Sequence, residues 1–300
     1  MSGTSTYADW IAVDWGATHL RAWAIGAGGD IRASAQSDAG IGSLGPESCE
    51  RVLLDLIDDW LGASPTPVLA CGMVGAKQGW QEAPLVPVPA KPTDLVPVRV
   101  TLAQDRRIAA FIVPGLSQAS PPDLMRGEET LIAGFLAAEP GFDGILCLPG
   151  AHSKWIHLSA GEVVSFQTLM TGEIFDLMSR RSVLRHSVAT GQLDEAAFAE
   201  AVGDTLSRPE RLAQRLFSIR AEAMLNGTDA AVSRARLSGG LIGVELAATR
   251  PYWLGQQVVV AGNPALADLY LRALATQGVG AQVRDAAPLT LAGLCRIRAG

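Results

Sequence analysis

The sequence is poor in the features that mark several common protein classes. It has only four cysteines, with no CxxC pair and no zinc-site spacing, which argues against a disulfide framework or a cysteine metal centre. The formal net charge is −6 and no run of basic residues occurs, which argues against a nucleic-acid-binding surface. The scattered cysteines are typical of small core residues in a reducing compartment.

Long apolar runs are also missing. No stretch reaches the length of a membrane span, and the polar first residues lack the apolar segment of a signal peptide. No G-x-G-x-x-G motif follows an early strand, which disfavours a nicotinamide-dependent dehydrogenase. We therefore expect a cytoplasmic protein without a membrane or nucleic-acid partner. The sequence leaves its oligomeric state open, a homo-oligomer included.

What the sequence does contain is a glycine turn between two apolar runs, at residues 11–25 (IAVDWGATHLRAWAI). This pattern predicts a β-hairpin. Gly16 lets backbone N–H groups approach an anion, and Thr18 adds a hydroxyl donor. Asp14, at the end of the first run, can hold a metal ion against phosphate oxygens. The segment is typical of a phosphate turn, and an ordinary hairpin explains it equally well.

A second segment, residues 144–168, repeats this pattern of strand, glycine turn and strand. Gly150 takes the place of Gly16, and Leu148 takes the place of Asp14, so only the first turn can hold a metal through that position. The second turn can bind phosphate through its backbone amides and the side chains of His152, Ser153 and Lys154. The duplication predicts two similar α/β domains, at residues 1–139 and 140–300.

Two further segments of the first half carry candidate binding groups. The stretch 72–97 is long for a loop inside a compact domain, so we expect it to line a site through Gly72, Met73, Val74, Gly75, Lys77, Gln78 and Trp80. At residues 123–130 (DLMRGEET), an arginine and several acids precede an apolar helix. Arg126 can orient an anionic substrate while a carboxylate accepts a proton. Acids at a helix start are also stabilised by the helix dipole alone.

The second half is predicted to be mainly helical after its strands. We expect helices at 172–183, 194–206, 209–225 and 228–249, the last of them broken at Gly239-Gly240. A buried strand at 257–261 leads into Gly262 and Asn263, which precede a proline at a helix start. These two residues are placed either to accept a nucleotide or simply to cap the next helix.

Together, these stretches resemble the 2-dehydro-3-deoxygalactonokinase family, within the superfamily of sugar kinases, heat-shock chaperone ATPases and actin. The matching segments span nearly the whole chain: DWGATHLRAW, GMVGAKQGW, EAPLVPVPA, MRGEET, LPGAHSKW, MTGEIFDL and SGGLIGVEL. The family often has Asn where His19 stands and Thr where Ala151 stands, so one hydroxyl contact at the second turn is lost.

The resemblance implies a fold of two duplicated RNase H-like (actin-like ATPase) domains with a central cleft. It implies ATP and Mg²⁺ as cofactors and a sugar acid as substrate. The reaction would transfer the γ-phosphoryl group of ATP to the 6-hydroxyl of 2-dehydro-3-deoxy-D-galactonate. A kinase for another 2-keto-3-deoxy sugar acid is an alternative. An actin-like or chaperone-like ATPase switch is another, but it would need an added partner-binding region, and beyond Asp285 only a short helix is predicted.

The resemblance also distributes roles among the residues. Asp14 would hold Mg²⁺, and Asp123 or Glu128 would be the general base, with sequence position favouring Asp123. Arg126 or Lys77 would hold the carboxylate of the substrate. We add Arg21 to the phosphate-binding residues, and to the substrate-binding residues we add Glu129, Thr171 and Glu173.

Overall fold

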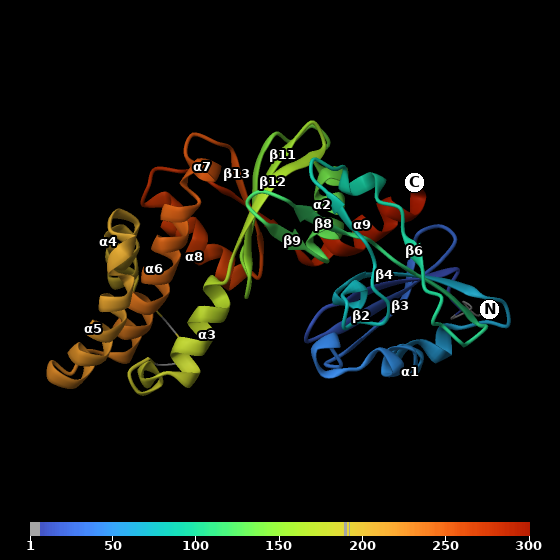
Figure 1. Ribbon diagram of the computed structural model, residues 1–300, viewed down its shortest axis with the longest axis horizontal. Coiled ribbons are helices and arrows are strands. Elements are labelled where there is room, and N and C mark those ends of the chain that lie inside the picture. The colour runs from blue at the N-terminus through green and yellow to red at the C-terminus, as the bar shows by residue number, and fades with distance from the viewer. Residues whose placement is uncertain (1–6, 189–190, 192) are drawn as a thin grey trace, which may run out of the picture. The chain divides into compact units, whose positions relative to one another are not determined.

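The computed structural model describes residues 7–188, 191 and 193–300, and within them the chain divides into two compact units (Figure 1). Unit 1 comprises the residues up to 142, residues 159–164 and residues 286–300; unit 2 comprises residues 143–158 and 165–285. The polar start of the chain, on which the expected lack of a signal peptide rests, lies partly outside the described residues. The last helix therefore belongs with unit 1, which differs from the predicted division at residues 139 and 140.

Unit 1 is built on a mixed sheet with the strand order β3-β2-β1-β4-β7-β6. The central strand β1 pairs antiparallel with β2 and parallel with β4, and β4 continues in parallel to β7. A second, smaller sheet has the order β5-β8-β9. The strands are β1 (Trp10–Trp15), β2 (Leu20–Ile25), β3 (Ile31–Ser37), β4 (Thr66–Gly72), β5 (Leu85–Pro87), β6 (Val98–Arg99), β7 (Ile108–Ile112), β8 (Gly115–Gln118) and β9 (Asp123–Met125).

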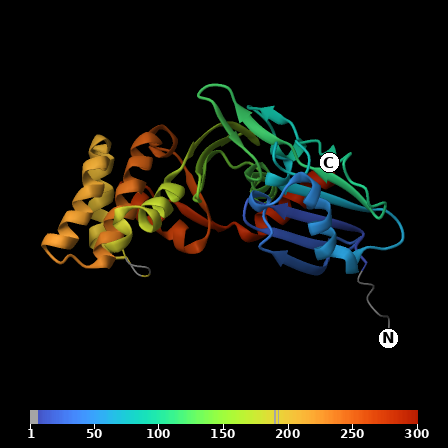
Figure 2. The same ribbon diagram turned by 60° about the horizontal axis from the view of Figure 1, so that its bottom comes forward.

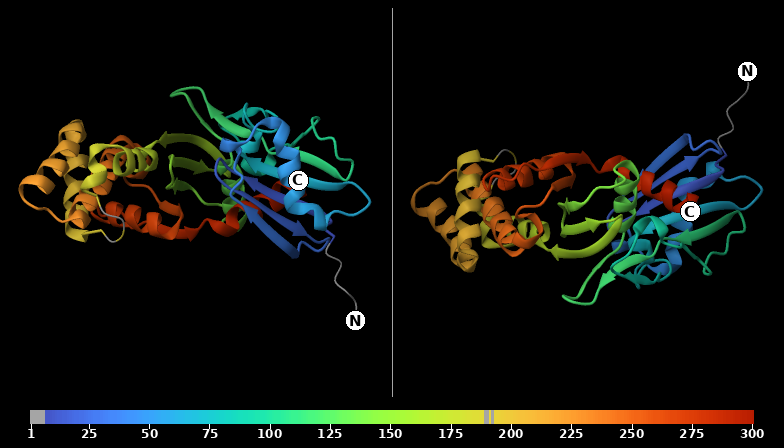
Figure 3. Two further views of the ribbon diagram at one scale, coloured as in Figure 1. Left: turned by 90° about the horizontal axis from the view of Figure 1, so that it is seen from below. Right: turned by 90° about the horizontal axis from the view of Figure 1, so that it is seen from above.

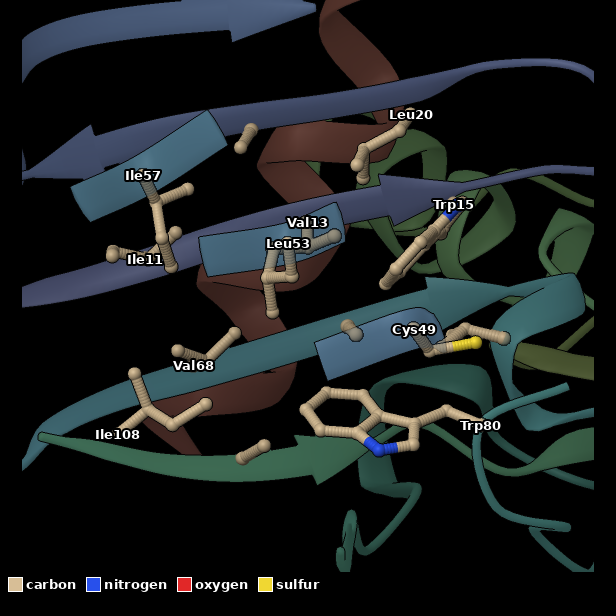
Figure 4. Close-up of a cluster of buried hydrophobic side chains, with 14 of the residues drawn as sticks. Ile11, Val13, Trp15, Leu20, Cys49, Leu53, Ile57, Val68, Trp80 and Ile108 are labelled. Carbon is tan, nitrogen blue, oxygen red and sulfur yellow. The ribbon is translucent and has the colours of Figure 1, made fainter. Parts of the chain in front are cut away.

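Helices cover both faces of the main sheet of unit 1 (Figure 2). Helix α1 (Pro46–Ile57) starts with a proline at its first position and buries Cys49, Leu53 and Ile57, which recur every four residues on one helix face. Figure 4 shows these three side chains packed against Ile11, Val13 and Val68 of the sheet. The other face of the sheet carries the last helix, α9 (Ala287–Ala299), seen in red beside the blue strands in Figure 3.

Helix α9 packs closely on helix α2 (Glu128–Ala138) through two glycines. A Cβ atom added to Gly134 would overlap the carbonyl oxygen of Leu289, and one added to Gly293 would overlap the carbonyl oxygen of Thr130. Only glycine permits this approach of the two backbones. The C-terminal segment is thus held in unit 1 by a specific helix contact.

Unit 2 repeats the sheet of unit 1, with the strand order β12-β11-β10-β13-β14. Its central strand β10 pairs antiparallel with β11 and parallel with β13, as β1 does with β2 and β4. The strands are β10 (Gly144–Leu148), β11 (Ser153–Ser159), β12 (Glu162–Leu169), β13 (Val258–Gly262) and β14 (Gln282–Asp285). This shared strand order confirms the predicted α/β fold with two related sheets.

The helices of unit 2 include a group in which α4 and α5 both pack against α6 (Figure 1). Helix α6 runs without interruption, so the break predicted at Gly239-Gly240 is wrong. Gly239 instead lets α6 approach α4, because a Cβ there would lie 2.5 Å from the carbonyl oxygen of Phe198. The helices are α3 (Thr171–Arg181), α4 (Glu195–Ser207), α5 (Leu212–Leu225), α6 (Ala230–Ala248), α7 (Arg250–Trp253) and α8 (Pro264–Ala275).

Within the part of the chain that the structure describes, no helix combines the length and the apolar character needed to cross a bilayer.

The close contact of α2 and α9 predicts the effect of a single methyl group. Gly293→Ala should destabilise the protein by about 1–3 kcal/mol, because the added Cβ forces the two helices apart. The control is Gly203→Ala in the middle of α4, where nothing lies within 4 Å of an added Cβ. There the better helix propensity of alanine should raise stability by up to about 1 kcal/mol. Urea unfolding of both variants measures the difference, and equal effects would contradict the packing argument.

Candidate active site

The first glycine turn, residues 16–19, joins β1 to β2 and is closed by a hydrogen bond from the amide of Gly16 to the carbonyl of His19 (3.0 Å). In the register of the two strands Asp14 lies opposite Arg21, and Arg21 Nη2 donates to Asp14 Oδ2 at 2.5 Å. A cavity of about 580 Å³ is lined by Asp14, Gly16, Thr18, His19, Arg21, Gln36, Ser37 and Asp38. The structure therefore brings together the four residues that the sequence assigned to this turn.

Three lining residues of this cavity were missed by the sequence reasoning, namely Gln36 and Ser37 of β3 and Asp38 directly after this strand. They line it because β3 pairs with β2, which places Gln36 beside Arg21 and Ser37 beside Leu20. Only the strand pairing reveals them, since no motif marks them in the sequence. Thr18 is exposed, and its hydroxyl lies 2.6 Å from the ring nitrogen Nδ1 of His19.

The predicted substrate loop, residues 72–97, contributes part of its side chains to the hydrophobic core and not to a binding site. Its residues Val74 and Trp80 are buried (0% and 2% exposed) and belong to the hydrophobic core of unit 1, as Figure 4 shows for Trp80. Their side chains therefore do not face a ligand, and we correct that part of the assignment. The apolar content that suggested a binding loop is explained by core packing. Lys77 and Gln78 are exposed beside this buried segment.

The acidic segment after β9 forms a tight turn into α2. Gly127 has a positive φ of 115°, a conformation that L side chains rarely adopt, and its amide donates to both carboxylate oxygens of Glu129 (2.9 and 2.7 Å). The amide of Arg126 donates to Glu128 Oε2 at 3.1 Å. Glu129 is fully buried. It therefore holds the turn and does not contact a substrate, contrary to its predicted role.

Arg126 is the basic group of this turn, and its guanidinium is only partly paired. Nη2 donates to the carbonyl of Ala83 at 3.0 Å, whereas the buried Nη1 finds no hydrogen-bond partner among the described residues. Burial lowers the pKa of Arg126, and the carboxylates of Glu129 and Glu82 act in the opposite direction. A buried donor without a partner costs free energy unless a ligand supplies an acceptor.

Burial and neighbouring carboxylates raise the pKa of two groups in this region, Cys71 of β4 and Glu129 of α2. Cys71 lies opposite Asp14 in the parallel pairing of β1 and β4. Burial, then the charges of Asp14 and Glu129, raise the pKa of the Cys71 thiol, which stays protonated as a core residue. Burial also raises the pKa of Glu129 to about 8, with a further contribution from Glu128, while the hydrogen bond from Gly127 opposes the shift.

The second turn, residues 149–152, joins β10 to β11 and is tied to helix α3. The amide of Glu173 donates to the carbonyl of Ala151 at 2.9 Å, and the ring of His152 lies 2.5 Å from a carboxylate oxygen of Glu173. Glu173 is therefore engaged with the second turn through a pair that is partly exposed to solvent, and its contact with the sugar acid stays a prediction.

A cavity of about 400 Å³ lies against this turn within unit 2. Its walls come from the turn, from the N-terminal ends of α3 and α8, and from α6. Asn263 caps α8, because its side chain accepts hydrogen bonds from the amides of Ala265 and Leu266 (3.0 and 3.4 Å). The lining residues include Gly150, Ala151, Thr171, Gly172, Phe175, Arg180, Arg234, Ser238, Asn263 and Tyr270.

This second cavity groups only some of the predicted residues. Gly150 and Asn263, which were both predicted to bind ATP, line this cavity. Thr171, which was predicted to bind the sugar acid, lines it as well. Ser153 and Lys154 are buried (0% and 4% exposed), and the hydroxyl of Ser153 donates to Glu245 Oε2 at 2.7 Å. The side chain of Ser153 is therefore turned into the core, and we correct its predicted phosphate contact.

Two lining side chains of the second cavity were missed although they lie in or near matching motifs. The guanidinium carbon of Arg234 lies 4.9 Å from the ring centroid of Phe175, which is a cation–π geometry. Phe175 belongs to the segment MTGEIFDL, and Arg234 precedes SGGLIGVEL by one helical turn. Helical spacing alone did not reveal that both point toward the same cavity.

The raised pKa of Glu129 predicts a pH dependence of stability. Because its pKa in the folded protein is about 8 and its ordinary value is 4.5, the folded state binds a proton that the unfolded state has released. The resulting contribution to the free energy of unfolding is fully present below pH 4.5 and is lost as the pH rises through 8. The total loss is on the order of 3–5 kcal/mol. Glu129→Gln removes the titration and retains an acceptor oxygen for the amide of Gly127.

Urea unfolding of the parent chain and of Glu129→Gln between pH 5 and 9 tests this expectation. The parent chain should lose stability relative to the variant as the pH rises. A difference between them that stays constant over this range would show that Glu129 is ionised throughout.

Comparisons with known proteins identify a family and several relatives that match almost the whole chain. The model of the family described as 2-keto-3-deoxy-galactonokinase matches residues 14–297. The probable 2-dehydro-3-deoxygalactonokinase of Rhizobium meliloti (strain 1021) is 38% identical over 289 residues, 94% of each chain. The 2-dehydro-3-deoxygalactonokinase of Escherichia coli (strain K12) is 34% identical over 275 residues, 90% of this chain and 91% of its own.

Solved structures show the same relationship. The crystal structure assigned to a 2-dehydro-3-deoxygalactonokinase protein from Sinorhizobium meliloti superimposes with a TM-score of 0.89 at 36% identity, covering 97% of this chain and 98% of its own. The activator of 2-hydroxyisocaproyl-CoA dehydratase from Clostridium difficile, with bound ADPNP, shares the fold alone (TM-score 0.52, 15% identity, 97% and 93% covered). Since both the family model and the relatives cover almost the entire sequence, the chain belongs to the 2-keto-3-deoxy-galactonokinase family.

Proposed function

We propose that this chain transfers the γ-phosphoryl group of ATP to the 6-hydroxyl of 2-dehydro-3-deoxy-D-galactonate. The observation that carries the proposal is identity of 34–38% to two proteins named for this activity, over at least 90% of each chain. The motifs that match the family include both glycine turns and the segment around Arg126, so the similarity covers the candidate sites in both units.

The nucleotide is assigned to the cavity of unit 2. Thr171 and Gly172 at the N-terminal end of α3 and Asn263, the N-cap of α8, line this cavity, and the dipoles of these two helices favour an anion there. Gly150 presents a backbone without a side chain at the same wall. Arg180 and Arg234 add positive charge, so the cavity suits the phosphates of ATP better than the carboxylate of a sugar acid.

A magnesium ion fits Asp14 as a single protein carboxylate. The described residues contain no group of three or more His, Cys, Asp or Glu side chains that could hold a metal by themselves. Mg²⁺ in phosphoryl-transfer enzymes is usually held by one or two carboxylates together with waters and substrate phosphates. Asp14 lies on the wall of the first cavity, so it would hold the ion there. The bound ion would neutralise charge on the transferred phosphoryl group.

The substrate carboxylate is assigned to Arg126. A guanidinium binds a carboxylate through two parallel hydrogen bonds, and the buried Nη1 of Arg126 lacks an acceptor in the described structure. Lys77, the other candidate, is exposed to solvent, where an ion pair contributes little. Gly75 lets the backbone of this segment pack closely against Arg126, because a Cβ there would lie 3.1 Å from Nη1 and 2.8 Å from Cγ2 of Ile112.

The general base must accept the proton of the 6-hydroxyl as phosphate is transferred. Glu128 lies in the first turn of α2, next to Gly127, and a Cβ on Gly127 would lie 3.1 Å from the Cα atom of Gly72 at the end of β4. Asp123 opens β9, at the edge of the small sheet. The placement near the ends of the central strands favours Glu128, in contrast to the preference that sequence position gave to Asp123.

A coupled assay of ADP release with a panel of 2-keto-3-deoxy sugar acids tests the function. We expect the highest kcat/KM with 2-dehydro-3-deoxy-D-galactonate and no ADP release without a sugar acid. Asp14→Asn should abolish turnover while the circular dichroism spectrum stays unchanged, because charge is removed at nearly constant volume. A higher kcat/KM for another sugar acid would establish the alternative kinase, and release without any acid would favour an ATPase switch.

Variants of the two carboxylates identify the base. Glu128→Gln should lower kcat by about 10²–10⁴-fold and remove the acidic limb of the pH–rate profile, whereas Asp123→Asn should keep kcat within a few-fold. The matched control is Glu47→Gln, an exposed acid in the first turn of α1, which should behave as the parent chain. The reverse result would assign the base to Asp123, and two active variants would exclude both.

A further inference from the structure

A single buried carboxylate, Glu245 of α6, lies in the core of unit 2 and is 1% exposed. Its Oε1 accepts a hydrogen bond from Trp155 Nε1 (2.8 Å), and its Oε2 accepts from Ser153 Oγ (2.7 Å) and Tyr270 OH (2.9 Å). The hydroxyl of Thr171 also donates to it. Four donors from other elements thus converge on one side chain.

These donors come from three elements that end at the second cavity. Ser153 and Trp155 begin β11, directly after the second turn; Thr171 begins α3; and Tyr270 lies on α8. The turn, the start of α3 and the residues of α8 are all walls of that cavity. Glu245 itself lies outside the lining residues, so it reaches the cavity only through its partners.

The segments that Glu245 connects also touch one another closely. A Cβ on Gly172 would overlap the carbonyl oxygen of Gly150, and one on Gly262 would lie 3.3 Å from the carbonyl oxygen of Pro149. Small movements of α3 or α8 would therefore move the backbone of the turn. A buried side chain with four hydrogen-bond donors around it fixes such segments because losing any donor leaves polar groups unpaired.

We propose that Glu245 is a positioning residue for nucleotide binding, which sets the spacing of the second turn, the start of α3 and helix α8. The inference rests on the proposed function, because it takes the cavity of unit 2 to be the nucleotide site. A carboxylate is suited to this role, since its two oxygens accept several hydrogen bonds in one plane and donate none. An apolar side chain of the same size would leave the three segments without a common anchor.

Titration calorimetry of the full chain with ADP and Mg²⁺ tests the proposal. Glu245→Leu should weaken ADP binding by about tenfold or more, because misplacement of binding groups by a fraction of an ångström has large effects. Glu245→Gln should bind ADP within about threefold of the parent chain. The amide oxygen of glutamine can accept from Trp155, and its NH₂ group can donate to a hydroxyl that rotates to become the acceptor. The KM for the sugar acid should stay within about twofold in both variants.

The control for lost stability is Leu246→Ala, the neighbouring residue on α6, which is fully buried and does not line the cavity. It should lower the melting temperature but leave ADP binding unchanged. If Leu246→Ala weakens ADP binding as much as Glu245→Leu does at a similar loss of stability, Glu245 is structural only and the inference is wrong.

A milder variant keeps the test decisive if Glu245→Leu does not fold. Ser153→Ala removes one donor without adding bulk and should weaken ADP binding by about threefold, with the sugar-acid KM unchanged. Unchanged ADP binding in folded Ser153→Ala, or in Glu245→Leu where that variant folds, would overturn this inference while leaving the proposed function intact. A parent chain that binds no ADP would overturn the proposed function and this inference together.

Discussion

The pairing of one central strand with an antiparallel neighbour on one side and a parallel neighbour on the other determines the candidate sites of this protein. In unit 1 this pairing places Asp14 opposite Arg21 across β1 and β2, and opposite Cys71 across β1 and β4. In unit 2 the same arrangement of β10, β11 and β13 places the second turn beside the end of β13. The glycine turns therefore emerge at equivalent points of two related sheets, and the second turn is also bordered by the N-terminal ends of α3 and α8, whose dipoles favour an anion.

Each unit also contains a buried carboxylate that organises a loop. Glu129 accepts the amide of Gly127 and holds the turn before α2, and Glu245 accepts hydrogen bonds from three elements around the second turn. Burying an ionisable group is costly unless hydrogen bonds compensate it, so such groups are rare where only packing is required. Their positions next to the candidate sites suggest that the cost is balanced by precise placement of the binding backbone.

Family membership and local geometry contribute different parts of the functional argument. The relatives indicate the reaction class. The fold alone does not, because proteins as distant as a dehydratase activator share it. The geometry then separates residues with a chemical role from residues of the core. Arg126 has a buried donor that finds no partner among the described residues. Trp80 and Ser153, which stand in equally well-matching motifs, instead direct their side chains into the hydrophobic core and toward a buried carboxylate.

The sequence by itself determined the local features of this protein: both strand–turn–strand segments, the helix start at Pro264 and the family. These depend on residues close together in the chain, where glycine, proline and capping side chains act over a few positions. Only the tertiary structure decided that α9 packs on α2, that α6 continues through Gly239 and that Glu245 joins three elements. Each of these depends on a backbone or side-chain contact between segments remote in sequence. The residues that surround a glycine or a glutamate in the sequence do not indicate which distant segment it will contact.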